Sequence, residues 1–212
     1  MGFITKIETL PRMKRRLVVY VDGERLGVIA AALAQEKGLS EGAALSDQDW
    51  QQLMEAEISP AFDLSLYYLG LRARTRHEME AYLKRRQYAP QVIAAVMDKL
   101  KDYGFVDDGE LSQRAVDSLS RQRLGRGAIE RKLRQRGVDK ELVREALDAY
   151  RPEDESENAR QLAATLWERY REAEPRKRWQ KTTAALARRG FSWDSIQSAM
   201  EGLSSSEDSG VW

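Results

Sequence analysis

The first sixty residues carry the short-range hydrophobic pattern of β-strands. Residues 17–21 form an apolar, β-branched run, Asp22-Gly23 is a strong two-residue turn signal, and apolar residues resume at 26–28. This pattern predicts a hairpin. A third strand is expected at residues 4–7, because an isolated two-stranded hairpin is only marginally stable in water.

Helical patterns complete this segment. One covers residues 30–37 and closes at Gly38. Another covers residues 48–57 and opens behind Ser46, an N-cap candidate with Asp49 three residues further on. Residues 1–59 are therefore expected to form a small α+β extension, a β-hairpin plus helices.

From residue 60 onward the apolar positions follow a helical period, in groups of three helices. Five core positions of the first group recur in the second at a constant spacing, as Leu69/Leu119, Met79/Ile129, Leu83/Leu133, Ile93/Val143 and Met97/Leu147. The third group follows with a slightly longer spacing, as in Leu133/Leu186 and Gly137/Gly190. Such self-similarity is the sequence signature of a tandem array, in which each unit buries its apolar face against its neighbours.

The predicted fold is therefore mainly all-α. It is an elongated tandem array of three three-helix repeats, at residues 60–106, 107–151 and 152–203, preceded by the α+β extension. Residues 204–212, rich in serine and acidic residues, are expected to form a disordered tail.

Capping signals mark the helix ends within these repeats. Thr75 and Glu78 match a capping box, and Pro90 suits the first position of a helix, where its missing N–H costs nothing. The other signals are N-cap candidates and glycine stops, at Gly104, Asp107 or Asp108, Gly137, Asp139, Gly190 and Ser192.

Composition narrows the class of protein. The chain of 212 residues has no cysteine, which excludes disulfides and thiolate metal sites. Its apolar runs are too short to span a bilayer, and its beginning lacks the pattern of a secretory signal. We expect a cytoplasmic protein without membrane contact. A monomer is the default state, because an array already presents an extended face.

Basic residues concentrate in the centre of the chain. The net charge is only +1, yet residues 61–150 hold 18 Lys and Arg against 14 Asp and Glu. The candidate partner-binding residues gather at helix junctions and on the second helix of the first two repeats: Arg72, Arg74, Arg76, Lys84, Arg85, Arg86, Arg121, Arg123, Arg126, Arg131, Lys132, Arg134 and Arg136. They could meet acidic protein loops or phosphates. Alternatively, they only solvate the outer face and favour helix dipoles.

Catalytic and metal sites are not indicated. Asp107-Asp108 needs no role beyond helix capping, and His77, the only histidine, has no second histidine or cysteine to complete a site. Gly125-Arg126-Gly127 lacks the third glycine and the strand of a dinucleotide-binding loop. We therefore expect no cofactor and no enzymatic activity. Four scattered tryptophans, Trp50, Trp167, Trp179 and Trp193, are interpreted as packing residues.

The ordered motifs resemble the RecX family, regulators of the RecA recombinase. The resemblance covers roughly residues 60–203 and rests on three segments, 68–83, 104–108 and 121–138, which include Tyr68-Leu69-Gly70-Leu71-Arg72, Gly104-Phe105-Val106-Asp107-Asp108 and Leu133-Arg134-Gln135-Arg136-Gly137-Val138. One departure is Gln87, where the family often has a glycine like Gly137 and Gly190.

The resemblance implies a non-enzymatic modulator, an inhibitor of RecA. Such a protein lies along the groove of the RecA filament on single-stranded DNA and alters its recombinase, ATPase and coprotease activities. The alternative is a helix-turn-helix-like protein that acts on DNA directly, since three-helix units with a basic second helix also describe such readers. Because the central charge is modest, we expect only weak, non-specific DNA binding.

Overall fold

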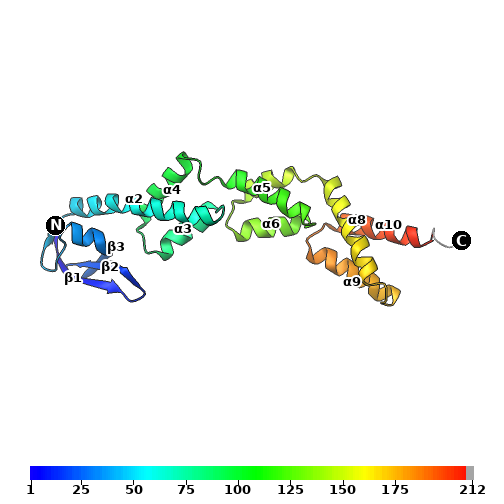
Figure 1. The fold of residues 1–212 in the computed structure, drawn as a ribbon, viewed down its shortest axis with the longest axis horizontal. Helices are drawn as coiled ribbons and strands as arrows, with labels where there is room; N and C mark the ends of the chain where they lie inside the picture. Colours follow the sequence, from blue (N-terminus) through cyan, green and yellow to red (C-terminus); the bar gives the residue numbers. More distant parts are fainter. Residues whose placement is uncertain (209–212) are drawn as a thin grey trace. The chain divides into compact units, whose positions relative to one another are not determined.

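The computed structural model describes residues 1–208, with side chains for residues 1–203, and divides into two compact units. The first unit, Met1–Asp107, contains a small sheet and the first three-helix repeat. The second unit begins at Asp108 and contains the second and third repeats (Figure 1). The prediction of three three-helix repeats behind an α+β extension is confirmed.

A four-stranded antiparallel sheet opens the first unit. Its strands are β1 (Gly2–Leu10), β2 (Met13–Val21), β3 (Glu24–Ala30) and β4 (Ala44–Leu45), in the order β3-β2-β1-β4. The predicted hairpin is confirmed, because Asp22 (φ 52°) and Gly23 (φ 86°) both adopt the left-handed conformation that a tight hairpin turn requires. The two-residue strand β4 was not predicted, since so short a segment carries no period.

The helix α1 (Ala31–Glu36) ends before Gly38, as predicted, and α2 (Asp47–Leu71) begins at the capping box of Ser46 and Asp49. However, α2 runs through Pro60, so the expected domain boundary between residues 59 and 60 falls inside one helix of 25 residues. An internal proline costs a helix about 3 kcal/mol. Glu57 and Ala61, on either side of Pro60, are almost completely buried, and this packing holds the helix together.

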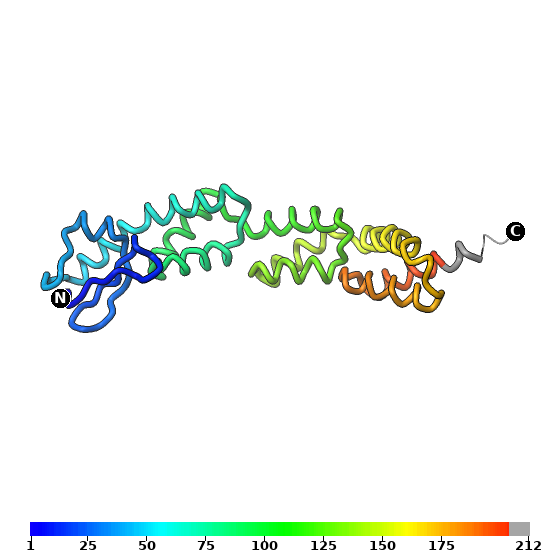
Figure 2. Tube along the Cα trace, turned by 60° about the horizontal axis from the view of Figure 1, so that its bottom comes forward, coloured from blue at the N-terminus to red at the C-terminus, as the bar shows by residue number. Residues whose placement is uncertain are grey.

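The three repeats share one plan. The second half of α2, α3 (Arg76–Arg85) and α4 (Pro90–Asp102) form repeat 1; α5 (Asp108–Arg121), α6 (Arg126–Gln135) and α7 (Lys140–Asp148) form repeat 2; α8 (Pro152–Arg169), α9 (Pro175–Arg188) and α10 (Trp193–Asp208) form repeat 3. Figure 2 follows the backbone through each of them. Leu83, Leu133 and Leu186, which match one another in sequence, are fully buried in their respective cores, whereas the matched pair Leu69 and Leu119 is only partly buried.

Two backbone segments join repeat 2 to repeat 3 within the second unit. The N–H of Gly125 donates to the carbonyl of Arg189 over 3.0 Å, and the N–H of Gly127 donates to the carbonyl of Gly190 over 3.0 Å. A carboxylate oxygen of the buried Glu155 accepts from the N–H of Arg126 over 2.9 Å. These contacts place the start of α6 directly against the turn that follows α9.

The end of the chain differs from expectation. The backbone of α10 remains helical to Asp208, past the expected start of a disordered tail at residue 204. No proline interrupts this stretch, so its serine and acidic residues can continue the helix. The rest of the expected tail, residues 209–212, lies outside the described residues. Within residues 1–208, no helix is long and apolar enough to cross a bilayer.

Gln87 adopts a left-handed conformation (φ 62°), like Gly137 (φ 79°) and Gly190 (φ 80°) at the matching positions. We expect Gln87→Gly to raise the free energy of unfolding by about 0.5–1 kcal/mol. The left-handed conformation costs a non-glycine residue about 1–2 kcal/mol, and the larger conformational entropy that glycine loses on folding offsets part of this gain. Urea denaturation measures the change. Arg85→Gly, in the last turn of α3, is the control and should lower stability by about 1 kcal/mol. An unchanged or lower midpoint for Gln87→Gly would contradict the prediction.

Candidate partner-binding surfaces

Three arginines at the junction of α2 and α3, Arg72, Arg74 and Arg76, are held by neighbouring side chains. Arg72 forms an ion pair with Glu78 at 2.8 Å, and Arg76 pairs with Glu80 at 2.9 Å. The guanidinium of Arg74 lies 4.0 Å from the centre of the Tyr68 ring. Arg72 and Arg76 remain exposed, whereas Arg74 is partly buried. The neighbouring side chains therefore hold the three guanidinium groups of this junction in defined orientations.

Arg74 is one end of a stacked column that joins α2 to α3. The rings of Tyr68 and Tyr82 lie parallel, with centres 3.8 Å apart and planes inclined by 7°. Arg86 covers the Tyr82 ring at 5.1 Å, so an arginine stands at each end of the column. Cation–π contacts of this kind contribute about 0.5–2 kcal/mol each. Replacing Arg74 or Arg86 would therefore change stability as well as charge.

The end of α3 carries the next three candidates. Lys84, Arg85 and Arg86 are exposed. Lys84 lies 4.0 Å from Glu80, the limit of an ion pair. Cations in the last turn interact favourably with the helix dipole, which accounts for a part of their placement. Their exposure leaves them accessible to a partner.

Arg126 in repeat 2 has an internal role. Its Nη1 donates to the carbonyls of Leu147 and Tyr150, over 2.8 and 2.6 Å, and its Nη2 lies 4.0 Å from Asp148. The guanidinium thereby binds two carbonyls at and just beyond the C-terminus of α7, of which that of Leu147 also accepts from the backbone N–H of Tyr150 over 3.0 Å. Arg126 matches Arg76 in the repeat, yet only part of its side chain is open to a partner.

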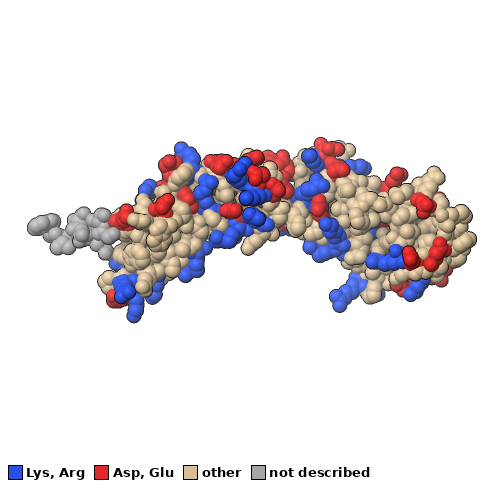
Figure 3. Space-filling view, turned by 180° about the vertical axis from the view of Figure 1, so that it is seen from behind, with Lys and Arg blue, Asp and Glu red and all other residues tan. Residues whose placement is uncertain are grey.

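The remaining candidates lie along α6 and at the end of α5. Arg131, Lys132 and Arg134 are exposed on α6, with Arg134 3.9 Å from Glu130, and Arg136 follows the helix in a partly buried position. Arg121 is exposed, whereas Arg123 is partly buried with φ 55°. Figure 3 shows basic side chains gathered over repeat 2, with acidic side chains mainly along one edge. The exposed cations of α6 make this helix the strongest candidate for contact with an anionic partner.

Tyr150 supports this surface from inside the second unit. Burial raises the pKa of its phenol, so the hydroxyl remains protonated at neutral pH. The hydroxyl donates to the carbonyl of Leu124 over 3.3 Å and accepts from the amide of Asn158 over 3.1 Å. It therefore ties the turn before α6 to α8.

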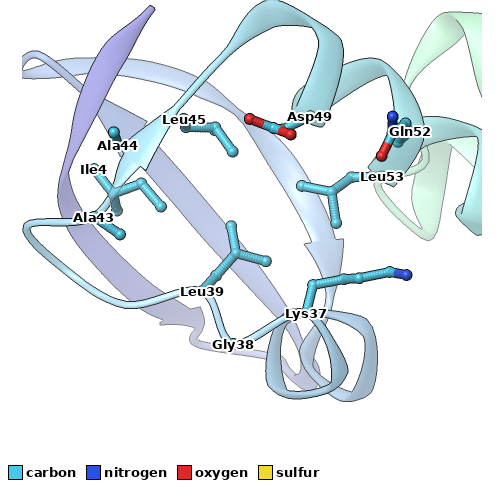
Figure 4. A pocket seen from close by; sticks show the side chains of 10 residues that line it. All are labelled: Ile4, Lys37, Gly38, Leu39, Ala43, Ala44, Leu45, Asp49, Gln52 and Leu53. Carbon is cyan, nitrogen blue, oxygen red and sulfur yellow. The ribbon is translucent and has the colours of Figure 1, made fainter.

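A small cavity of about 210 Å³, lined by both apolar and polar residues, lies in the first unit beneath β4 (Figure 4). Leu39, Leu45 and Leu53 point into it, whereas the amino group of Lys37 points away from its centre. Among the residues that the structure describes, no group of three or more His, Cys, Asp or Glu is placed to hold a metal ion.

The interpretation of four tryptophans as packing residues is wrong for two of them. Trp50 and Trp167 do pack against cores, but Trp179 is 46% exposed and Trp193 is 61% exposed. Trp193 is the first residue of α10. The two rings flank a groove of about 360 Å³ on repeat 3.

Comparison with known proteins identifies all three repeats. Residues 61–100 match the first three-helix domain of RecX, residues 107–147 match the second, and residues 153–200 match the third. Together these matches cover more than half of the chain.

Complete proteins of the same family resemble the whole chain. It is 29% identical to the regulatory protein RecX of Bacillus subtilis (strain 168), over 98% of this chain and 80% of the relative. It is 27% identical to the regulatory protein RecX of Clostridioides difficile (strain 630), over 96% of each. A crystal structure of regulatory protein RecX matches 95% of this chain and 100% of its own, with a TM-score of 0.66 and 27% identity. RecX from Lactobacillus salivarius matches 71% of this chain and 98% of its own, at the same TM-score and 26% identity.

Proposed function

Since this chain belongs to the RecX family, we propose that it is a non-enzymatic inhibitor of the RecA recombinase. The protein binds as a monomer along the groove of the RecA filament on single-stranded DNA and alters its recombinase, ATPase and coprotease activities. The observation that carries the proposal is the match of all three repeats to the RecX domains, in order and over most of the chain.

The exposed cations support this proposal physically. Basic residues end the second helix of repeat 1 and cover the second helix of repeat 2, so that the same structural element presents positive charge twice. Two weakly binding surfaces on one chain reinforce each other through effective concentration. A filament, which repeats the same subunit, offers several places for such contacts.

The first test is the DNA-dependent ATPase rate of the cognate RecA, with this protein added after the filaments have formed. Inhibition is expected at protein concentrations too low to occupy the DNA. Fluorescence anisotropy of the DNA without RecA measures this occupancy in parallel. Inhibition that appears only when the DNA itself is covered would favour the alternative, a helix-turn-helix-like protein that acts on DNA directly.

Charge reversal on α6 tests the surface. We expect Arg131→Glu/Lys132→Glu to raise the concentration needed for half-maximal ATPase inhibition at least about tenfold, the equivalent of 1.4 kcal/mol, because each change replaces attraction by repulsion. Arg114→Glu/Arg144→Glu is a control with the same change of charge on exposed residues of α5 and α7. Circular dichroism confirms that both variants are folded. Equal inhibition by the two variants would remove α6 from the interface.

A further inference from the structure

A second cavity in the first unit is lined by a different set of side chains. It measures about 360 Å³ and lies between β3, the first turns of α2, and the connection from α3 to α4. Its lining includes two cations, two amides and two aromatic rings: Arg25, Lys84, Gln87, Gln91, Trp50 and Tyr88. None of its lining residues is acidic. The cavity is therefore suited to an anionic ligand that also carries a flat ring.

The Trp50 ring is held in place by β3. A Cβ atom on Gly27 would lie only 2.6 Å from Cζ2 of Trp50, so the indole packs directly on the backbone of the strand. The rest of the side chain is partly buried and packs against the core of the first unit. One part of the indole is thereby fixed, while another part faces the cavity.

Arg16 fixes the opposite wall. Its guanidinium lies 4.2 Å from the centre of the Tyr88 ring, and its Nη2 donates to the carbonyl of Gln87 over 3.1 Å. Glu57, which is buried, forms an ion pair with Arg16 and keeps this guanidinium in position. Residues 87 and 88 are thus anchored to the sheet, and the cavity is largely preformed. Preformed walls lower the entropy lost when a ligand binds.

The two cations lie where a ligand could reach them. Arg25 is exposed, and the Lys84 side chain is 68% exposed, with Glu80 at 4.0 Å as a distant ion-pair partner. Gln91 adds an amide, whose Nε2 lies 3.4 Å from Oε1 of Gln51 in a weak hydrogen bond that a ligand can replace. Phosphate oxygens suit the cations, and the edge of a nucleobase suits the amide.

From this arrangement we propose that the cavity binds one nucleotide unit. Arg25 and Lys84 hold its phosphate, and its base lies against Trp50 and Tyr88. Stacking of a base on an aromatic side chain is favourable and tolerates any base sequence, because every base has a flat aromatic face. The unit belongs either to single-stranded nucleic acid or to a free nucleotide. This site assigns a binding role to the extension in front of the repeats, and it does not depend on contact with RecA.

The test measures binding in the absence of RecA. Fluorescence anisotropy of a labelled oligothymidylate gives the dissociation constant as a function of salt, and titration calorimetry with thymidine monophosphate measures the free nucleotide. Arg25→Ala/Lys84→Ala should weaken binding at least about tenfold, since both charge-assisted hydrogen bonds to the phosphate are lost. The salt dependence for the oligonucleotide should also become less steep, because fewer counterions are released.

Arg12→Ala/Lys101→Ala is the matched control, since it removes two exposed cations of the same unit that do not line the cavity. This variant should bind like the unaltered protein. Equal weakening by both double variants would overturn the proposal, as would the absence of any nucleotide binding at low salt. Binding of the oligonucleotide alone identifies single-stranded nucleic acid as the source of the unit, and comparable binding of the monophosphate identifies a free nucleotide.

Photochemical cross-linking locates the base. Irradiation with an oligonucleotide that contains 5-iododeoxyuridine, followed by mass spectrometry, should attach the base to peptides that contain Trp50 or Tyr88. Cross-links confined to Trp179 and Trp193 would overturn the proposal and place the base on the groove of repeat 3 instead. RecA inhibition is a separate measurement, so its loss or persistence does not decide the outcome for the cavity.

Discussion

Replacement of Gly190 by alanine is expected to lower the free energy of unfolding of the second unit by about 3–4 kcal/mol. Gly190 has φ +80°, and the left-handed conformation costs an alanine about 1–2 kcal/mol. The added Cβ would also lie 2.1 Å from the backbone nitrogen of Ala128, which belongs to α6 and cannot rotate away. The turn must therefore move, and the hydrogen bonds from Gly125 and Gly127 would be lost at about 1 kcal/mol each.

Alanine substitutions at two other glycines distinguish the cost of backbone strain from the cost of the close contact. Gly104 has φ +69° and open space around its Cβ position, so Gly104→Ala should cost only the conformational strain of about 1–2 kcal/mol. Gly125 has an ordinary φ of −76°, yet its Cβ would lie 2.4 Å from the Gly190 carbonyl oxygen and the Phe191 backbone. Gly125→Ala therefore tests the close approach alone.

Urea unfolding measured by tryptophan fluorescence reports these changes, because Trp167, Trp179 and Trp193 lie in repeat 3 and Trp50 lies in the first unit, which contains Gly104. Hydrogen exchange of the Gly125 and Gly127 amides should accelerate strongly in Gly190→Ala, since the carbonyls that protect them move away. If Gly190→Ala destabilises the protein no more than Gly104→Ala does, the close contact between the two repeats contributes nothing.

Local signals in the sequence are enough to predict most of the helices and the hairpin. The Asp22-Gly23 turn and the capping boxes at Ser46 and Thr75 depend only on neighbouring residues, and all three form as expected. The glycine stop at Gly190 is also predictable from neighbouring residues. The close approach of Gly190 to α6 is not. That contact joins residues far apart along the chain, and no local pattern announces it.

Tertiary packing overrides local preference elsewhere. Pro60 is a strong signal for a helix boundary, yet burial of the residues on both sides carries α2 through it. Trp179 and Trp193 have the hydrophobicity of core residues, yet both remain largely exposed. Hydrophobicity alone does not distinguish a residue that fills a core from one that lines an exposed groove.

The candidate surface was predictable as a set of basic residues, but their individual roles were not. Arg126 and Arg131 both read as basic residues of the same predicted helix. In the structure, the first donates to the carbonyls of Leu147 and Tyr150, whereas the second is exposed. The stacked column of Arg74, Tyr68, Tyr82 and Arg86 was not anticipated, since it is assembled from two different helices. Charge can be counted along a chain, whereas the partner of each charge depends on the fold.

The buried ion pair in the first unit predicts the second large effect. Glu57 is 1% exposed and accepts from two groups, Arg16 and the N–H of Ala30. We expect Glu57→Ala to lower the free energy of unfolding of this unit by about 3–5 kcal/mol, because the change leaves the Arg16 guanidinium buried without a countercharge. The expected loss of stability is large because this ion pair links β2, β3 and α2. Through Gln87, Arg16 also holds the connection from α3 to α4.

A variant that lacks both charges separates the effect of the charge from that of the packing. Arg16→Met/Glu57→Met removes both charges and keeps much of the volume, so most of the stability lost in Glu57→Ala should return, since replacement of a buried pair by apolar residues is often neutral. Urea unfolding with circular dichroism gives the free energies. Glu110→Ala, which breaks the exposed pair with Arg114, should change stability by less than about 1 kcal/mol. If the double variant is as unstable as Glu57→Ala, the hydrogen bonds to Ala30 and Gln87, rather than the unpaired charge, hold the sheet against the repeat.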